Sequence, residues 1–239
     1  MNIFNELLYR PLFNLLVFLY NTLAGHDLGV AIILVTIIVK LILYSFSQSS
    51  IQSQKAMMEI QPKVKEIQEK YKNDKEKQAT AIFDIYKSYK VNPFSSFLVI
   101  LVQIPILIAL YKVFLDGLDL NKMVNLYSFV AKPSSINHLF LGFLDLSKAS
   151  PVLAILAGAS SFIQSRMMMP KVEKKDKKDD FMSLWSEQMI FMTPFITTLV
   201  AWKFPAGLAL YWTTITLFSI IQQYFTPTLK TQTRLLDAK

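Results

Sequence analysis

Residues 28–46 read LGVAIILVTIIVKLILYSF, a run of nineteen residues in which Lys40 is the only charge. A helix of about 20 mostly apolar residues crosses the hydrocarbon core of a bilayer, which is about 30 Å thick. The chain of 239 residues is 53% hydrophobic and 18% charged, and the two kinds of residue lie in separate blocks. A soluble domain mixes them, because each of its elements has a wet and a dry face. The sequence therefore predicts an all-α polytopic membrane protein.

Four more apolar segments follow the first, at residues 94–115, 139–163, 189–202 and 205–225. The second is interrupted by Gln103 and Pro105, and the third is best defined from Pro151 onward. Only Lys203-Phe204 separates the last two, so we expect them to be antiparallel neighbours. With residues 28–46, these segments predict five transmembrane helices within a core of residues 28–225.

The first 27 residues are amphipathic rather than continuously apolar. Apolar side chains recur at helical spacing, charged and amide side chains lie between them, and Pro11 stands in the middle. This pattern favours a helix that lies in the outer membrane interface. The alternative is a bent, partly inserted span.

The connections between the spans are strongly polar. Residues 47–92 are rich in Gln, Lys and Glu and repeat apolar residues three and four apart, which predicts a helical hairpin outside the membrane. Asn73-Asp74 is expected to break the pattern and cap its second helix, and Pro62 to bend or interrupt the first. Residues 166–187 are predicted to be a mobile charged loop, and residues 226–239 a basic tail.

The basic residues of the connections set the orientation. Residues 47–92 hold nine Lys and Arg, residues 166–187 six, and the chain from residue 226 onward three. On the other side, residues 1–27 and 116–137 hold three in all. Cytoplasmic loops carry the excess of positive charge. We therefore expect the N-terminus outside, and the hairpin, the charged loop and the C-terminus in the cytoplasm.

Composition argues against several classes of protein. The chain has no cysteine and two histidines, far apart, so neither a disulfide framework nor a metal site is expected. The spans contain no pair of acids and no Ser-His set that would indicate catalysis, and no phosphate-binding glycine loop is present. The net charge of +8 fits cytoplasmic loops and anionic lipid better than DNA. We expect no enzyme activity and no cofactor.

Lys40 is the most informative side chain within the spans. A lysine near the middle of a membrane helix costs about 2–3 kcal/mol on insertion scales. Its long side chain could reach the interface, or its charge could face a water-filled cavity. No Asp or Glu within the spans is available as a partner, which favours the cavity. Thr36, one helical turn earlier, would extend a polar stripe on the same face.

Further residues are candidates for the same groove or for substrate reception. Gln103, Gln164 and Thr214 add polarity within or beside the spans, and each taken singly is explained by contacts between helices. Met57, Met58, Met167 and Met168 would offer flexible apolar surface near the inner leaflet, which suits binding of varied hydrophobic segments or of a ribosome. Membrane contact or chance explains these methionines equally well.

Two motifs carry a family resemblance. Residues 204–212, FPAGLALYW, are followed by Ile220-Ile-Gln-Gln223, and residues 103–111, QIPILIALY, follow Asn92-Pro93. With the position and character of residues 47–92, these motifs resemble the YidC/Oxa/Alb family of membrane protein insertases from about residue 28 to residue 225.

The resemblance implies both a fold and an activity. The five helices would enclose a hydrophilic groove, open to the cytoplasm and to lipid, with a basic residue on the first core helix at the position of Lys40. Bacterial members usually carry arginine there. Tyr211 and Trp212 match aromatic residues that line the substrate path. The implied activity is insertion of nascent membrane proteins into the bacterial plasma membrane, with the ribosome as a partner, alone or beside the Sec translocon.

Two rival functions remain open at this point. A small transporter or channel would use Lys40 as an anion or proton site, and it would show flux without a polypeptide substrate. A passive scaffold would tolerate Lys40→Leu. Without the two motifs, the residues alone support a polytopic membrane protein with a wet cavity.

Overall fold

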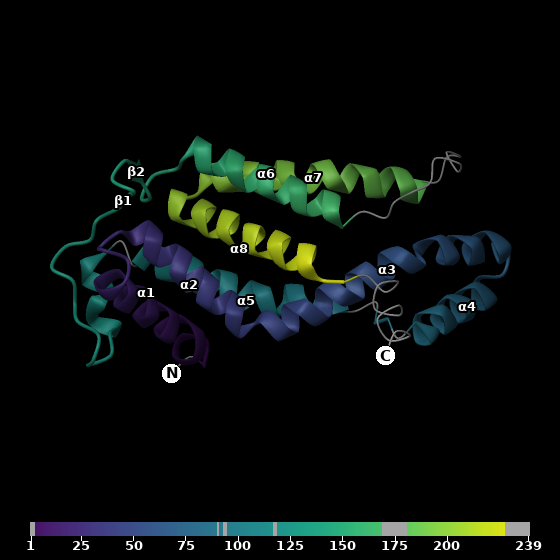
Figure 1. Ribbon diagram of the computed structural model, residues 1–239, viewed down its shortest axis with the longest axis horizontal. Coiled ribbons are helices and arrows are strands. Elements are labelled where there is room, and N and C mark those ends of the chain that lie inside the picture. Colours follow the sequence, from purple (N-terminus) through teal and green to yellow (C-terminus); the bar gives the residue numbers. More distant parts are fainter. Residues whose placement is uncertain (1–2, 90, 93–94, 117–118, 169–180, 228–239) are drawn as a thin grey trace.

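The computed structural model describes residues 3–89, 91–92, 95–116, 119–168 and 181–227, and most of these residues are helical. Figure 1 shows an elongated bundle with a helical hairpin at one end and a small β-hairpin at the other. The elements in chain order are η1 (Asn5–Tyr9, a π-helix), α1 (Arg10–Thr22), α2 (Leu28–Ile42), α3 (Tyr44–Lys70), α4 (Lys75–Ser88), α5 (Ser95–Asp116), η2 (Leu120–Asn125, a 3-10 helix), β1 (Leu139–Phe140), β2 (Leu144–Asp145), α6 (Pro151–Met167), α7 (Phe181–Lys203) and α8 (Ala206–Phe225).

The N-terminal segment is a helix packed against the bundle. Pro11 lies in the first turn of α1, where π-helical hydrogen bonding gives way to the α-helix. Phe13, Leu16 and Tyr20 are buried, and α1 contacts α2 and α5. The amphipathic pattern therefore corresponds to a helix whose apolar face packs against the core.

The run at residues 28–46 is divided between two helices. α2 ends at Ile42, and α3 begins two residues later with a change of direction of 70°. In the described part of the chain, no single helix is both long enough and apolar enough to qualify as a membrane span, whereas α2 and α3 qualify as a bent pair.

The predicted hairpin is present as α3 and α4. The Asp74 side chain accepts a hydrogen bond from the Lys77 N–H at 3.1 Å, which confirms the predicted cap. Pro62 was predicted to bend or interrupt the first helix; it does not interrupt it, since α3 runs through Pro62 to Lys70, and a bend there stays a prediction. Pro62 is exposed, so water can bind the carbonyl group that its missing N–H leaves free. A separate small core of Ala56, Ile60 and Val91 holds the hairpin together.

The third predicted span is shorter than expected. α6 begins at Pro151, with Ser150 as its cap, and residues 139–145 form the β-hairpin instead of membrane helix. Residues 139–144 are mostly apolar, which favoured the prediction of a membrane helix. In the structure Leu141 and Gly142 both have positive φ, which makes a tight turn and is incompatible with a helix. Lys148 therefore belongs to the connection and not to the span.

The last two predicted spans correspond to α7 and α8. α7 begins at Phe181, within the segment predicted as a charged loop, so the expected boundary at residue 187 is wrong. Residues 169–180 of that loop and residues 228–239 of the predicted tail lie outside the described residues. α6 packs against both α7 and α8, and Gly158 lies so close to Thr198 that a Cβ atom at residue 158 would overlap its hydroxyl group.

α2 and α8 lie side by side and run in the same direction. Ile32 lies against Gly207 near the start of the two helices, and Lys40 contacts Ser219 near their ends. α1, α2, α5 and α8 supply most of the buried apolar side chains of the main core. The parallel pair places Lys40 toward the end of the bundle from which α3 and α4 project (Figure 1).

Candidate functional site

Lys40 lies in the last turn of α2 and is half-buried against α8. Its Nζ donates a hydrogen bond to Ser219 Oγ at 2.9 Å, and it lies 6.0 Å from the centre of the Phe218 ring. Ser219 in turn donates to the Ile215 carbonyl oxygen at 2.8 Å. The ion pairs found among the described residues, Arg10–Glu6, Lys77–Asp74 and Lys148–Asp145, do not involve Lys40. The ammonium group is therefore held by a neutral hydroxyl.

Thr36 precedes Lys40 by one turn, as predicted, and is buried; its place in a groove stays a prediction. The side chain is 1% exposed, and its hydroxyl donates to the Ile32 carbonyl oxygen at 2.6 Å. In this arrangement Thr36 packs between helices, and Lys40 is the side chain of α2 that presents a polar group at the surface.

Gln103 and Tyr211, predicted separately, are brought together. Gln103 Nε2 donates to the Tyr211 hydroxyl at 2.9 Å, which joins α5 to α8 two residues before Pro105. Tyr211 is buried, and its ring lies 5.8 Å from that of Phe114. This hydrogen bond satisfies two polar groups that would otherwise be costly inside an apolar bundle.

Among the described residues, Trp212, Thr214 and Gln164 form no hydrogen bond with either of these two pairs. Trp212 is half-buried and packs against the main core. The Thr214 hydroxyl donates to the Leu210 carbonyl oxygen of its own helix at 2.8 Å. Gln164 is half-buried on α6. Their place in a groove stays a prediction.

A set of polar contacts joins the start of α3 to the end of α8; we call it the α3–α8 contact. Gln222 accepts from the Ser47 hydroxyl at 3.1 Å and donates to Gln48 Oε1 at 3.2 Å. Thr226 also donates to Gln48, at 3.2 Å. Lys55 Nζ donates to the carbonyl oxygens of Gln223 and Thr226, and burial lowers the pKa of Lys55.

Sequence reasoning missed Ser219 and the pairing of α3 with the end of α8. Ser219 and Gln222 lie on α8 and Thr226 is its C-cap residue, and their spacings of three and four place them on one side of the helix end. That spacing is visible in the sequence. The pairing with α3 is not, because it depends on the bend at Leu43.

The methionines proposed for substrate reception lie on two helices. Met57 packs against the small core of the hairpin, and Met58, its neighbour on α3, is half-buried. Met167 ends α6 and Met168 follows it, both half-buried. Their predicted role stays a prediction.

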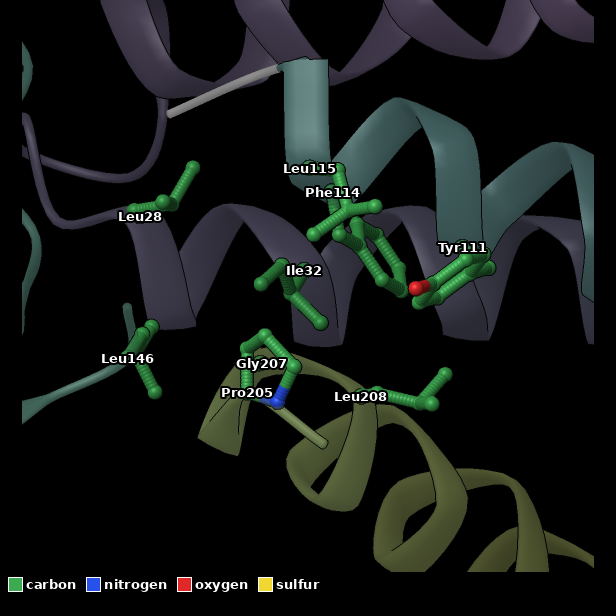
Figure 2. Close-up of a pocket in the computed structure, with 9 residues that line it drawn as sticks. All are labelled: Leu28, Ile32, Tyr111, Phe114, Leu115, Leu146, Pro205, Gly207 and Leu208. Carbon is green, nitrogen blue, oxygen red and sulfur yellow. The ribbon is translucent and has the colours of Figure 1, made fainter. Parts of the chain in front are cut away.

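A small apolar pocket lies at the other end of the α2–α8 pair (Figure 2). Its empty space, counted together with the space open to the surroundings, is about 280 Å³, and its walls include Ile32, Tyr111, Phe114, Leu146 and Leu208. From residue 28 to residue 40 α2 rises about 18 Å. The pocket is therefore separate from Lys40, and its lining offers little to a polar ligand.

Comparison with known proteins places this geometry in a family. The sequence model described as 60Kd inner membrane protein matches residues 18–233. The membrane protein insertase YidC of Geobacter sulfurreducens is 33% identical over 221 residues, which are 92% of this chain and 37% of that protein. That of Alcanivorax borkumensis is 35% identical over 229 residues, 90% of this chain and 35% of the relative. The chain thus spans about a third of the length of these curated relatives.

The fold agrees with the sequence comparison. A solved structure described as an active YidC insertase with its first transmembrane domain resolved matches with a TM-score of 0.59 at 26% identity. The match covers 95% of this chain and 48% of that one. By sequence and by fold, this chain belongs to the 60Kd inner membrane protein family, the family of the YidC insertases to which it is similar.

Proposed function

We propose that this protein is a membrane protein insertase. It moves hydrophobic segments and short polar tails of nascent proteins from the cytoplasm into the bilayer, alone or with the Sec translocon. The names of its relatives support the activity. The observation that carries the mechanism is Lys40, an ammonium group in an apolar bundle that is held by the hydroxyl of Ser219 and not by a carboxylate.

The proposal treats α2, α5, α6, α7 and α8 as the five membrane helices around a hydrophilic groove. The polar groups of Lys40, Ser219, Gln103 and Tyr211 come from three of these helices. α3 and α4 project beyond the ends of α2 and α8 and would lie in the cytoplasm, with the β-hairpin at the outer end (Figure 1). The bacterial plasma membrane, with the N-terminus outside, fits the distribution of lysines.

Lys40 would act by exchanging its partner. A polar tail that crosses the hydrocarbon core leaves backbone groups unsatisfied at several kcal/mol each, and a wet groove shortens that path. The hydrogen bond to Ser219 has one charged partner, whereas a carboxylate would add direct attraction between opposite charges, which is strong where water is scarce. An acidic side chain on the tail would therefore displace Ser219 from Lys40. Burial of the apolar segment in lipid, at about 25 cal/mol per Å², would drive the transfer without ATP.

Substrate reception is assigned to the cytoplasmic end. The α3–α4 hairpin and the methionines Met57, Met58, Met167 and Met168 would meet the nascent segment first. The basic tail at residues 226–239 would bind the ribosome by charge. The same protein would work with or without the Sec translocon, depending on the substrate.

The test uses the purified protein in liposomes. The substrate is a single-span peptide with an acidic tail, and protection of the tail from protease reports insertion. We expect protection above that of empty liposomes, a strong loss with Lys40→Ala, and retention with Lys40→Arg. Lys203→Ala, an exposed lysine at the end of α7, is the matched control and should insert normally.

Each result has a distinct meaning. Protection that is unchanged by Lys40→Ala would keep the insertase and refute the role of Lys40. A substrate with a neutral tail should lose little with Lys40→Ala, since charge recognition is then absent. Absence of protection in every sample, together with ion flux in the same liposomes without peptide, would favour a transporter that uses Lys40 as an anion or proton site.

A further inference from the structure

The turn of the β-hairpin holds a leucine in an unfavourable backbone conformation. Leu141 has φ of 52° and Gly142 has φ of 81°, and the Phe143 N–H donates to the Phe140 carbonyl oxygen across them. Positive φ at both central residues is normally met by Asn, Asp or Gly. A leucine there is strained by its Cβ atom. In a turn that faces water, the leucine side chain would bring nothing to offset that strain.

The same turn exposes its apolar side chains. Leu141 is 60% exposed and Phe143 is 75% exposed. Two large apolar groups at the tip of a short hairpin are therefore free to contact something outside the chain.

The hairpin is fixed on the outer ends of two core helices. Asp27 caps the start of α2 and also accepts from the Leu141 N–H at 2.7 Å. Phe140 lies on Gly29, where a Cβ atom would overlap its ring. The Leu146 carbonyl oxygen accepts from the Gly207 N–H at the start of α8. The tip is thus held at a set level along the axis of the bundle.

We infer that Leu141 and Phe143 dip into the interface of the outer leaflet and anchor this end of the bundle to lipid. The proposal rests on the membrane placement of the bundle given above, and not on its insertase activity. It assigns a lipid-contacting role to a connection that the sequence comparison leaves without one.

Three observations favour lipid as the occupant. Exposed apolar side chains continue from the hairpin onto the first turns of α6, at Val152 and Ile155. Lys148, beside the hairpin, pairs with Asp145 but keeps its side chain 80% exposed, so a lipid phosphate can compete with Asp145 for it without disturbing the core. Two side chains also offer far less than the 1,000 Å² or so that a specific protein interface needs. Lipid requires no such complementary area.

The absence of cysteine from the chain allows a direct test by single labelled cysteines. An environment-sensitive fluorophore is placed at Phe143→Cys, at Ser134→Cys as an exposed control on the same connection, and at Ile155→Cys as a control on the face of α6 proposed to meet lipid. The full chain is placed in liposomes of phosphatidylethanolamine and phosphatidylglycerol. Nitroxide groups on the lipids and iodide in the water serve as quenchers.

We expect the label at residue 143 to emit at shorter wavelength, to be quenched by shallow lipid nitroxides and to be shielded from iodide, with the opposite result at residue 134. Adding Leu141→Asn to Phe143→Cys should reverse much of this shielding, although the turn itself becomes less strained. Because this double variant relieves strain, loss of folding would not explain the change.

The remaining outcomes overturn the inference. Iodide quenching at residue 143 equal to that at residue 134 would show that the tip lies in water. Shielding that persists in detergent, without quenching by nitroxide lipids, would show that another protein surface covers it. If Ile155→Cys is also unquenched by lipid, the membrane placement itself fails. If residue 155 is quenched and residue 143 is not, only the hairpin inference fails.

Discussion

Lys55 Nζ donates a hydrogen bond to the backbone carbonyl oxygen of Gln223 at 2.6 Å, across 168 residues of sequence. The same ammonium group reaches the carbonyl oxygen of Thr226. The last carbonyl groups of a helix have no partner within it, and a cation there is favourable. The first helix of the hairpin thus caps the C-terminal end of the helix that carries Ser219.

Replacing this cap should destabilise the fold. Lys55→Met keeps the apolar part of the side chain and removes its donor, which leaves two carbonyl groups partly buried. We expect a loss of about 1 kcal/mol, at the low end for an unsatisfied group because water can reach part of the site. Thermal unfolding in detergent measures it. Lys72→Met, in the exposed turn of the hairpin, is the control, and equal melting of the two variants would contradict the assignment.

Gly158 should not accept a side chain. A Cβ atom at residue 158 would overlap Thr198 Oγ1 and lie 3.3 Å from the Pro194 carbonyl oxygen. Gly158→Ala should therefore cost about 1–3 kcal/mol through overpacking between α6 and α7. Thermal unfolding again measures the loss. Thr198→Ala in the same chain removes the overlapping atom and should restore much of the stability; if it does not, the contact between the two helices is misplaced.

The register of α6 against α7 can be tested by a disulfide. Ser161 Oγ and Thr197 Oγ1 lie 3.5 Å apart, both on buried side chains. Because both side chains are short, cysteines there should be close enough to bridge. Ser161→Cys with Thr197→Cys should form a disulfide under mild oxidation, seen as a change of mobility that reductant reverses. The pair Ser161→Cys with Ile196→Cys should not, since Ile196 faces outward.

The outer connection should respond to acid. Hydrogen bonds from Ser147, and next from Lys148, lower the pKa of Asp145 to about 2. Because the folded pKa lies below the ordinary value of 3.8, this contribution to stability is present above about pH 4 and is lost as the pH falls toward 2. Carbon NMR of the labelled carboxyl group follows the titration. Ser147→Ala should raise the pKa, and an unchanged value would assign the shift to another group.

A variant of Ser219 can show whether its hydroxyl group only holds Lys40 until a substrate arrives or is itself required for insertion. If a substrate carboxylate displaces the hydroxyl, Ser219→Ala should leave insertion of an acidic tail near normal, whereas Lys40→Ala abolishes most of it. The liposome assay compares the two variants. A loss with Ser219→Ala as large as that with Lys40→Ala would show that the hydroxyl itself is required.

The sequence predicted which segments are helical better than it predicted where the helices bend or end. Apolar runs at residues 94–115 and 205–225 correspond closely to α5 and α8, because long periodic or apolar segments leave little choice of structure. The break at Leu43 was missed because residues on both sides of it are mostly apolar, and the contacts that accompany the bend, of α3 with α5 and with Gln222, join segments far apart in the sequence. The turn at Leu141 was missed since leucine is not a turn residue.

The candidate site was predictable only as separate residues. Lys40 stands out as a charge in an apolar run, and Gln103 and Tyr211 lie within recognisable motifs. That Gln103 meets Tyr211, and that Lys40 meets Ser219, depends on which helices become neighbours. One sequence does not give that arrangement, because the partners are more than 100 residues apart.

The parallel pairing of α2 with α8 also determines when, during synthesis of the chain, Lys40 can meet its partner. Lys40 and Ser219 are 179 residues apart. At a synthesis rate of about 5–20 residues per second, roughly 10–35 s pass between the emergence of the two partners from the ribosome. During that interval the lysine has no serine to hold it, and α8 completes the site last. A ribosome that stalls before α8 would thus leave a chain in which the ammonium group of Lys40 still lacks the hydroxyl partner of Ser219.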